Sequence, residues 1–571
     1  MSAPSIDGDA TLLNSIFRKP GRRWAILAVV VVVVVVQMLM FLHATTPGIR
    51  LNPRPASIHN YHPAVHHDAW SGVASVLFNK APPPSALSGQ QSNLRRCSDI
   101  PIPDSYWTVQ DASAPAFVTI PSNRRIGVDD TVCVRVVVPA KPTGVFLAYA
   151  PFPNTPWDSV LVDLVGEHSK VSVPVHLQPV KDVRNTYRDS THIYEADVRL
   201  RDVDVYRATG YIEFRGGEWN CEGGLAPVDY NPELLYISEM LTVEVSDPQN
   251  SSPYSLDRYM DLPLCTELDS DGRWVMAAKL PFEPHNIPLP DNHGMVWLPY
   301  MCRLRRMAYT DYTQCLATRY PMMHWFGDSN LRRALKKLTT LGRWCQTGEE
   351  QLTRPCICED YKEEFTRFNS TYREMLIDMD PESGGHMLTD ESADFTTTPA
   401  GMARIYFHKW EGLSPKNKPA WHKSFSKGMT SRYGTPQVAV VSLVNWDAAF
   451  ATRGVFAMEL RRLLDYIERD YAPETEIVLR LGQYHCCRSD HDPPDTRGFS
   501  RLRVEYFNQY FVNAFAERFG ASRSLHVWDV ATITERRQWS HRNESTDCNA
   551  NHARAEIVET ENQVLMNAMC N

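Results

Sequence analysis

A short apolar segment, a glycine turn and an amphipathic segment follow one another near the middle of the chain, and no other stretch restricts the fold as strongly. The apolar part runs from Tyr320 to Gly327, and the residues after Ser329 place leucines at helical spacing with arginines and lysines between them. A short apolar run that ends in glycine indicates a buried strand, whereas the leucine spacing indicates a helix. We therefore predict a strand, a tight turn and a helix that begins just after Ser329.

Ser329 would then lie at a helix N-terminus, where backbone N–H groups have no partners within the helix. These N–H groups and the positive end of the helix dipole favour negative charge, which suits an alkoxide nucleophile and a developing oxyanion. The simpler alternative is that Asp328 or Ser329 only caps the helix. The position after a strand and the residues found downstream favour the chemical interpretation.

The chain from 300 to 571 alternates strand and helix patterns, and we assign it to one domain. Its strand patterns lie at Ala403–Phe407, Gln437–Val444, Glu476–Leu481 and Leu525–Asp529, and its helix patterns lie at Gly454–Arg469, 498–519 and Glu556–Met569. Such alternation predicts an α/β domain, in which a parallel sheet carries helices on both faces and functional residues follow the carboxyl ends of strands. Ser329 and Asn445 both occupy such positions.

A histidine near the C-terminus completes the candidate set. His552 lies in a predicted loop ahead of the last helix, and Asp547 precedes it in the same loop. A histidine there can act as the base for Ser329, with an acidic neighbour that fixes its tautomer. A loop histidine that only faces solvent is the alternative, and no metal site is predicted.

Residues 24–42 are almost entirely apolar and include an unbroken run of valines. At ~1.5 Å per residue a helix of this length spans a bilayer core of roughly 30 Å. Basic residues precede the segment and none follows directly, so the positive-inside rule predicts a cytosolic tail at 1–23, a transmembrane signal anchor at 24–42 and a lumenal remainder. The prediction is a single-pass type II membrane protein of the secretory pathway, in the Golgi. A cleaved signal peptide is the alternative, but the run is long and no small-residue cleavage site follows.

Between this segment and residue 300 the composition changes twice. Residues 43–100 are rich in Pro, His, Ser and Asn, which is typical of a stem. Residues 101–247 contain short runs with period-two alternation, which predict an all-β, Ig- or filamin-like sandwich. This domain is either a structural module or one that binds sugars or positions them. Residues 248–299 are proline-rich and are predicted to be a linker.

The net charge and the cysteines indicate which partners and which cellular compartment to expect. A net charge of −8 gives no indication of nucleic-acid binding. The 13 cysteines indicate disulfides and hence an oxidising compartment, and their odd number leaves at least one without an intramolecular partner. The pairing stays open. Sequons at Asn250, Asn369 and Asn543 predict glycosylation in the lumen.

The ordered set of Gly327-Asp328-Ser329, Asn445 after a strand, and Asp547 with His552 near the C-terminus resembles the SGNH (GDSL-like) esterase superfamily. Within it the chain is similar to the PC-esterase branch, on the segments Phe326–Arg333 and Trp528–Thr534. A sandwich ahead of the esterase domain looks most like the neurexophilin and PC-esterase domain (NXPE) arrangement. The resemblance covers roughly 300–571, and 101–247 more loosely.

The resemblance implies a role for each matching residue. Ser329 would be the nucleophile, His552 its base and Asp547 the orienting acid, while the Ser329 backbone N–H and the Asn445 side chain would line the oxyanion hole. The superfamily also has a glycine in the second of its sequence blocks, and in this chain that glycine would be Gly401 or Gly412. The family spacing is Asp-x-x-His, however, and in this chain that spacing leads to Asn549. Either Asp547 reaches His552 across two additional residues, or the amide of Asn549 takes the place of the acid.

The expected function is serine acyl transfer, by a lumenal O-acetyltransferase or O-acetylesterase that acts on glycan or polysaccharide hydroxyls. No tightly bound cofactor is expected. The acyl donor is either acetyl-CoA or another acetyl carrier. A membrane protein that supplies this donor is a potential partner.

Two alternatives come from other classes. A type II Golgi glycosyltransferase would use Asp490-His491-Asp492 in place of an Asp-x-Asp metal motif, although prolines surround this cluster and Ser489 before it belongs to no serine motif. A non-catalytic binding glycoprotein on a decayed esterase fold would explain the irregular spacing of Asp547 and Asn549.

Overall fold

The computed structural model describes much of the chain after residue 95. The described residues are 96–108, 114–140, 156–186, 190–217, 219, 232–249, 252–268, 271–291, 293–339, 375–379, 398, 400–413, 425, 428–484, 500–537, 553 and 555–571. The predicted tail, the predicted anchor, nearly all of the stem and the three sequon asparagines, Asn250, Asn369 and Asn543, lie outside these residues.

Within this described part, no helix has both the length and the apolar composition that crossing a bilayer requires. Its longest helices, α12 (Arg453–Asp470) and α13 (Arg501–Phe519), carry charged side chains along their length. The finding contradicts the transmembrane helix in the predicted fold class, and with it the predicted single-pass type II membrane location. The segment 24–42 itself lies outside the described residues, and neither prediction is carried further.

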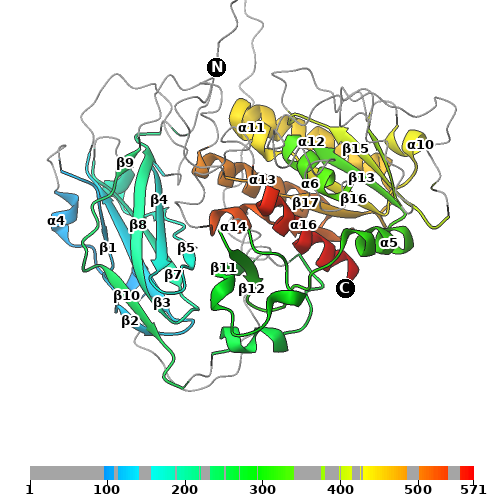
Figure 1. Cartoon of the computed structure of the whole chain (residues 1–571). Coiled ribbons are helices and arrows are strands. Elements are labelled where there is room, and N and C mark those ends of the chain that lie inside the picture. The colour runs from blue at the N-terminus through cyan, green and yellow to red at the C-terminus, as the bar shows by residue number, and fades with distance from the viewer. Residues whose placement is uncertain are drawn as a thin grey trace, which may run out of the picture. The chain divides into compact units, whose positions relative to one another are not determined.

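The described strands between Phe117 and Ser246 form a sandwich of two β-sheets around one hydrophobic core (Figure 1). The first sheet has the order β1 (Phe117–Thr119), β3 (Thr131–Val138), β7 (His192–Arg199), β6 (Gln178–Pro179). The second has the order β2 (Arg125–Gly127), β10 (Thr242–Ser246), β8 (Asp204–Phe214), β4 (Ser159–Gly166), β5 (Ser172–Pro174), with β9 (Glu233–Leu234) paired to β8. All pairs are antiparallel except β2 with β10. Alternate valines of β3 enter the core, which is why the period-two pattern identified this strand.

Residues 248–299, predicted as a linker, contain a β-hairpin of β11 (Gly272–Met276) and β12 (Met295–Pro299). Trp274 and Trp297 pair across the hairpin with their ring centroids 5.7 Å apart, and both are buried. The indole Nε1 of Trp274 also donates to the Ile533 carbonyl oxygen at 2.8 Å. The linker prediction was wrong here because two tryptophans, far apart in a proline-rich sequence, are joined by pairing that composition does not reveal.

The C-terminal part is built on a six-stranded sheet in which every pair is parallel. Its order is β14 (Met375–Met379), β15 (Ala403–Lys409), β13 (Met322–Gly327), β16 (Val438–Ser442), β17 (Glu476–Arg480), β18 (Leu525–Trp528). The described helices around it are α5 (Tyr309–Arg319), α6 (Ser329–Thr339), α10 (Met429–Tyr433), α11 (Val444–Phe450), α12, α13, α14 (Val530–Glu535) and α16 (Ala555–Cys570). Because the chain adds strands first on one side of β13 and then on the other, the strand order reverses there.

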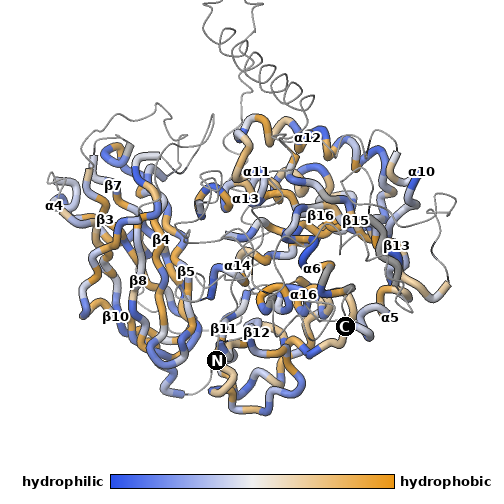
Figure 2. Tube along the Cα trace, turned by 45° about the horizontal axis from the view of Figure 1, so that its top comes forward, coloured by the Kyte–Doolittle hydropathy of each residue, from blue (hydrophilic) through white to orange (hydrophobic). Residues whose placement is uncertain are grey.

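Both faces of this sheet are buried, as the near-continuous apolar strands require. In β16, Val438 and Val440 enter one core together with residues of α5, α6 and α16. Ala439 and Val441 enter a second core with residues of α12 and α13. Figure 2 shows hydrophobic residues concentrated along these strands. The predicted parallel sheet with helices on both faces is thus present, and so is the predicted strand–turn–helix unit of β13 and α6.

Three disulfides join the described cysteines: Cys97–Cys133, Cys265–Cys302 and Cys315–Cys570. The first ties the end of the predicted stem to β3, and the third ties the last helix to α5. The predicted use of cysteines in disulfides is confirmed for these six.

A buried carboxyl group lies where β8 meets residues that follow β17. The Glu213 carboxylate accepts hydrogen bonds from the Ser159 hydroxyl at 2.8 Å, the Tyr484 hydroxyl at 3.1 Å and the Arg501 backbone N–H at 3.2 Å. Burial disfavours its charged form and raises the pKa of Glu213 to about 7, although these donors and the Arg501 charge act in the opposite direction.

Because of Glu213, the protein should become less stable as the pH rises. In the unfolded chain the carboxyl group loses its proton near its ordinary pKa of 4.5, whereas the folded protein retains the proton up to about pH 7. The free energy of unfolding should drop by about 3 kcal/mol between these values and then level off. Glu213→Gln stays neutral and should lack this drop in urea unfolding at pH 5 and pH 8. The exposed Glu244→Gln is the control, and parallel pH profiles for wild type and Glu213→Gln would contradict the assignment.

Candidate active site

Ser329 is the first residue of α6 and follows the central strand β13 by two positions. The turn between them requires glycine, because a Cβ at Gly327 would lie 2.8 Å from both the Leu331 side chain and the Ser442 carbonyl oxygen. Ser329 itself is partly exposed. Strand order reverses at β13, and ligands in open parallel sheets bind at the carboxyl edge beside such a reversal.

The neighbouring acid, Asp328, serves the helix. Its side chain is buried, and its carboxylate accepts the Asn330 backbone N–H at 2.9 Å. Burial raises the pKa of Asp328, while the nearby Arg480 charge works against the rise. The capping alternative therefore holds for Asp328, which leaves Ser329 as the side chain of this turn that solvent reaches.

The adjacent strands bring further predicted residues to the same edge. Gly327 pairs with Ser442 of β16 on one side and with Lys409 of β15 on the other. Asn445 follows Ser442 by three residues and Gly412 follows Lys409 by three residues. The loops after β13, β15 and β16 thus all leave the sheet at the level of Ser329.

The Asn445 side chain is held in one orientation by a two-point contact. Its Nδ2 donates to the Gln483 carbonyl oxygen at 2.8 Å, and its Oδ1 accepts the Gln483 backbone N–H at 3.1 Å. An amide nitrogen carries two hydrogens. One of them is used by Gln483, so the second is the one that an oxyanion would take.

Of the two candidate glycines, Gly412 lies at this edge, whereas Gly401 precedes β15 and lies at the opposite one. Gly412 has φ 76° and leaves no room for a Cβ, which would come 2.8 Å from the Asp447 carboxylate. The next N–H, that of Leu413, donates to the same carboxylate at 2.9 Å. Asp447 belongs to α11, so this contact ties the loop after β15 to the helix that carries Asn445.

A buried charged group that the sequence analysis missed supports this edge. Arg480, at the end of β17, donates from Nη2 to Glu561 of α16 at 2.8 Å, and both side chains are fully buried. The Gln483 side chain donates to the same carboxylate. Burial raises the pKa of Glu561, while the Arg480 charge opposes the rise. The available signal was the arginine that directly follows the apolar run Ile477–Leu479, because parallel strands buried on both faces normally exclude unpaired charge.

His324, which lies in β13 a few residues before Ser329, is part of the core. It is fully buried, and its Nδ1 lies 2.7 Å from the Tyr471 hydroxyl oxygen. Burial lowers the pKa of His324 well below its ordinary value, and the histidine at position 408 contributes in the same direction. A neutral histidine enclosed by aromatic rings does not provide a base for Ser329.

The predicted base and its orienting residues, His552, Asp547 and Asn549, lie outside the described residues, as does the alternative cluster Ser489–Asp492. Their attachment points are described. Ala553, directly after His552, is buried in the same core as Leu331, two residues after Ser329. The helix α16 that follows is joined to the carboxyl edge of the sheet through the contacts of Glu561 with Arg480 and Gln483.

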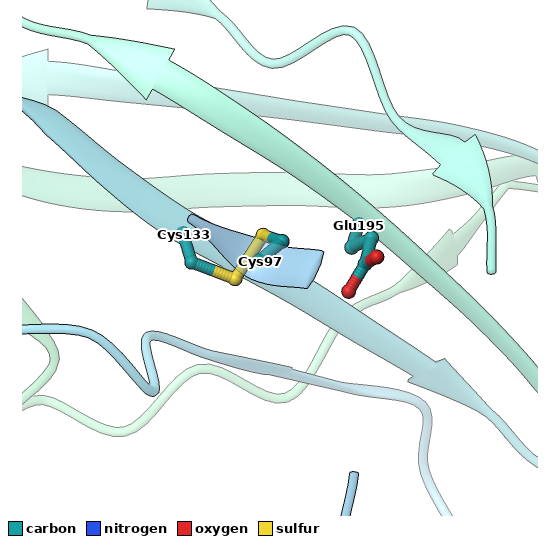
Figure 3. Close-up of side chains that lie close together, drawn as sticks. All are labelled: Cys97, Cys133 and Glu195. Carbon is teal, nitrogen blue, oxygen red and sulfur yellow. A yellow bond between two sulfur atoms is a disulfide. The ribbon is translucent and has the colours of Figure 1, made fainter. Parts of the chain in front are cut away.

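Among the described residues, the ligand atoms of Cys97, Cys133 and Glu195 lie within 4.8 Å of one another (Figure 3). The two sulfur atoms form a disulfide, so neither is a thiolate, and Glu195 accepts from Arg135 at 2.8 Å. Metal binding by cysteine requires thiolates. This group therefore does not fit a metal centre.

Neither a comparison with models of protein families nor a search of curated proteins finds a significant match to this chain.

Proposed function

We propose that the protein is a serine acyl-transfer enzyme that moves an acetyl group to or from a glycan hydroxyl. One observation carries the proposal: Ser329 begins a helix at the carboxyl edge of the central strand, and the neighbouring strand β16 is followed at the same edge by Asn445, whose side chain is fixed by Gln483. Helix N–H groups and a fixed amide are the donors that stabilise a tetrahedral oxyanion. The resemblance to the PC-esterase branch of the SGNH superfamily supports the same assignment.

In the proposed reaction, His552 takes the hydroxyl proton as the Ser329 oxygen attacks the acetyl carbonyl carbon. The Ser329 N–H and the Asn445 side chain hold the oxyanion until the donor's leaving group departs with a proton from His552. A sugar hydroxyl or water then attacks the acetyl-serine ester and loses its proton to His552. His552 passes this proton to the departing Ser329 oxygen, which restores both the hydroxyl and the neutral base. Asp547 or Asn549 orients His552. The donor is acetyl-CoA or another activated acetyl carrier for a transferase, and the acetylated glycan itself for an esterase.

The disulfides support the choice of glycans as acceptors. Three pairs among the described cysteines fit a lumenal or secreted protein, since thiols in the cytosol are kept reduced. Glycans with free hydroxyl groups are abundant substrates in that environment.

Trapping the acyl-enzyme tests the proposal. The full chain would be mixed with p-nitrophenyl acetate, quenched in acid and analysed by peptide mass spectrometry. Acetyl should be found on Ser329, while the exposed Ser431 in the same digest stays unmodified. Added oligosaccharide then separates the two directions, because a transferase acetylates the sugar whereas an esterase releases acetate. No acetyl-Ser329 in folded protein would contradict the proposal and favour a non-catalytic binding protein.

Asn445→Ala should reduce kcat by about 10²-fold, the loss that follows removal of one oxyanion donor. Deacylation of acetyl-Ser329 should slow to a similar degree, with KM little changed. Asn508→Ala is the matched control, because Asn508 makes the same two-point contact with the Gly482 backbone but is assigned no part in the chemistry. Equal losses of kcat in both variants, at equal stability, would show that Asn445 acts only by holding the loop.

A further inference from the structure

An open cavity of about 890 Å³ lies along β6 and β7 of the sandwich, and its lining also includes Asp271, Tyr300 and Arg536. Sites that enclose organic ligands have volumes in this range. The disulfide and Glu195 of Figure 3 belong to its wall. Arg135 beside them is 1% exposed and donates to the Pro101 carbonyl oxygen at 3.1 Å, so this part of the wall is rigid.

Positive charge is in excess on the lining. Among the described lining residues, six are basic, Arg135, Lys181, Arg184, Arg199, Arg201 and Arg536, and four are acidic, Asp182, Glu195, Asp197 and Asp271. The excess of two positive charges contrasts with the net charge of −8 of the whole chain.

The carboxylates of the lining are already engaged. Asp182 pairs with Arg184 at 2.8 Å and Asp271 pairs with Arg536 at 3.0 Å. Asp197 accepts the Cys97 backbone N–H at 2.8 Å. These contacts leave the positive charge of other side chains to face a ligand.

Two basic side chains carry most of this surplus. Lys181 is exposed and forms no ion pair within the described residues. Arg199 is about half exposed and lies 3.5 Å from Asp129, a carboxylate that it shares with Arg201.

The surplus charges lie at opposite ends of the cavity. Lys181 follows β6, whose Pro179 pairs with Tyr194 of β7, whereas Arg199 is the last residue of β7. At about 3.3 Å per residue, the two positions are roughly 20 Å apart along the strand. A single small anion cannot contact both ends, but a linear chain with an acidic group on successive units can.

We infer that this cavity binds an acidic polysaccharide, whose carboxylates contact Lys181 and Arg199 while its sugar rings lie against the wall between them. The lining includes the partly exposed apolar side chains of Ile102 and Pro179, which suit the C–H faces of sugar rings. It also includes Glu195 and Asp197, whose carboxylates are engaged by Arg135 and by the Cys97 backbone N–H. Single-stranded nucleic acid is disfavoured, because the described lining holds one Tyr and no Phe or Trp for base stacking, and this Tyr300 is buried. The choice of a saccharide rests on the proposed function, whereas the charge argument does not.

The test measures binding by isothermal titration calorimetry with the full-length Ser329→Ala protein, so that no turnover intervenes. The probes are an oligogalacturonate, a neutral malto-oligosaccharide and a polyglutamate peptide of matched length. Lys181→Glu with Arg199→Glu should weaken oligogalacturonate binding by at least about tenfold, and added salt should weaken it further. The matched control is Arg125→Glu with Arg207→Glu, two exposed arginines on the other sheet of the sandwich, which should change binding by less than about twofold.

Three results would overturn the inference. They are the absence of oligogalacturonate binding to the parent protein, equal losses in the cavity and control variants, and equally tight binding of polyglutamate or the neutral oligosaccharide. The same double variants with Ser329 intact should still form the acyl-enzyme. A variant that loses saccharide binding but still forms acetyl-Ser329 shows that the cavity is distinct from the active site. A protein that binds the saccharide but never acetylates Ser329 supports the cavity and contradicts the proposed function.

Discussion

Replacement of Ser329 by alanine should reduce acyl transfer by at least about 10⁴-fold and leave the fold unchanged. Loss of a catalytic serine removes the covalent intermediate, and what remains is the small contribution of the oxyanion donors. Alanine is the best helix-forming residue, and Ser329 lies at the start of α6 in a partly exposed position, so the substitution disturbs little packing. The measurements are labelling by a serine-directed fluorophosphonate and hydrolysis of an activated acetyl ester.

Ser431→Ala is the matched control for Ser329→Ala. Ser431 is an exposed serine in the short helix α10, and its hydroxyl donates to the Gly428 carbonyl oxygen at 2.8 Å. It should label and turn over like the wild type. His552→Ala should slow labelling strongly, because the serine then lacks its base. Wild-type labelling of Ser329→Ala would show that another residue reacts, and the assignment of the nucleophile would be wrong.

Removal of the Glu561 carboxylate should destabilise the protein by about 3–5 kcal/mol, the usual cost of leaving a buried charge without its partner. Arg480 is fully buried and depends on Glu561 for its ion pair, and Gln483 donates to the same carboxylate. Glu561→Ala therefore exposes two polar groups to an apolar environment at once. The measurement is the free energy of unfolding in urea.

Two further variants distinguish a lost partner from a lost contact. Arg480→Met with Glu561→Leu removes both charges and should recover most of the stability, because apolar residues of similar volume can replace a buried pair. Glu468→Ala removes an exposed partner of Arg518 and should cost less than about 1 kcal/mol. If the single and double variants were equally unstable, packing rather than charge would hold this edge of the sheet.

The Glu561 variants also connect stability with the proposed chemistry. Gln483 contacts Glu561 through its side chain and Asn445 through its backbone. A shift of Gln483 should therefore reach the proposed oxyanion hole. The double variant is informative here, because it can restore folding without restoring the position of Gln483.

The sequence by itself determined the local structure of the candidate site. Apolar periodicity and Gly327 depend on neighbours only a few residues away. They predicted β13 and a helix that begins just after Ser329, and α6 begins at Ser329 itself. The same reasoning identified β16 and placed Asn445 after it. It also predicted that strands of this domain pair in parallel, because alternating strands and helices leave few other arrangements.

Only the tertiary structure decided what surrounds these residues. Arg480 and Glu561 are 81 positions apart, and nothing near either residue in the sequence identifies the other as its partner before the two elements pack. The contact between Asn445 and Gln483 and the pairing of Trp274 with Trp297 are long-range in the same sense. A periodic pattern in the sequence indicates which face of a helix or strand is apolar, but not which other element covers that face. The long-range contacts and the order of the strands are therefore known only from the tertiary structure.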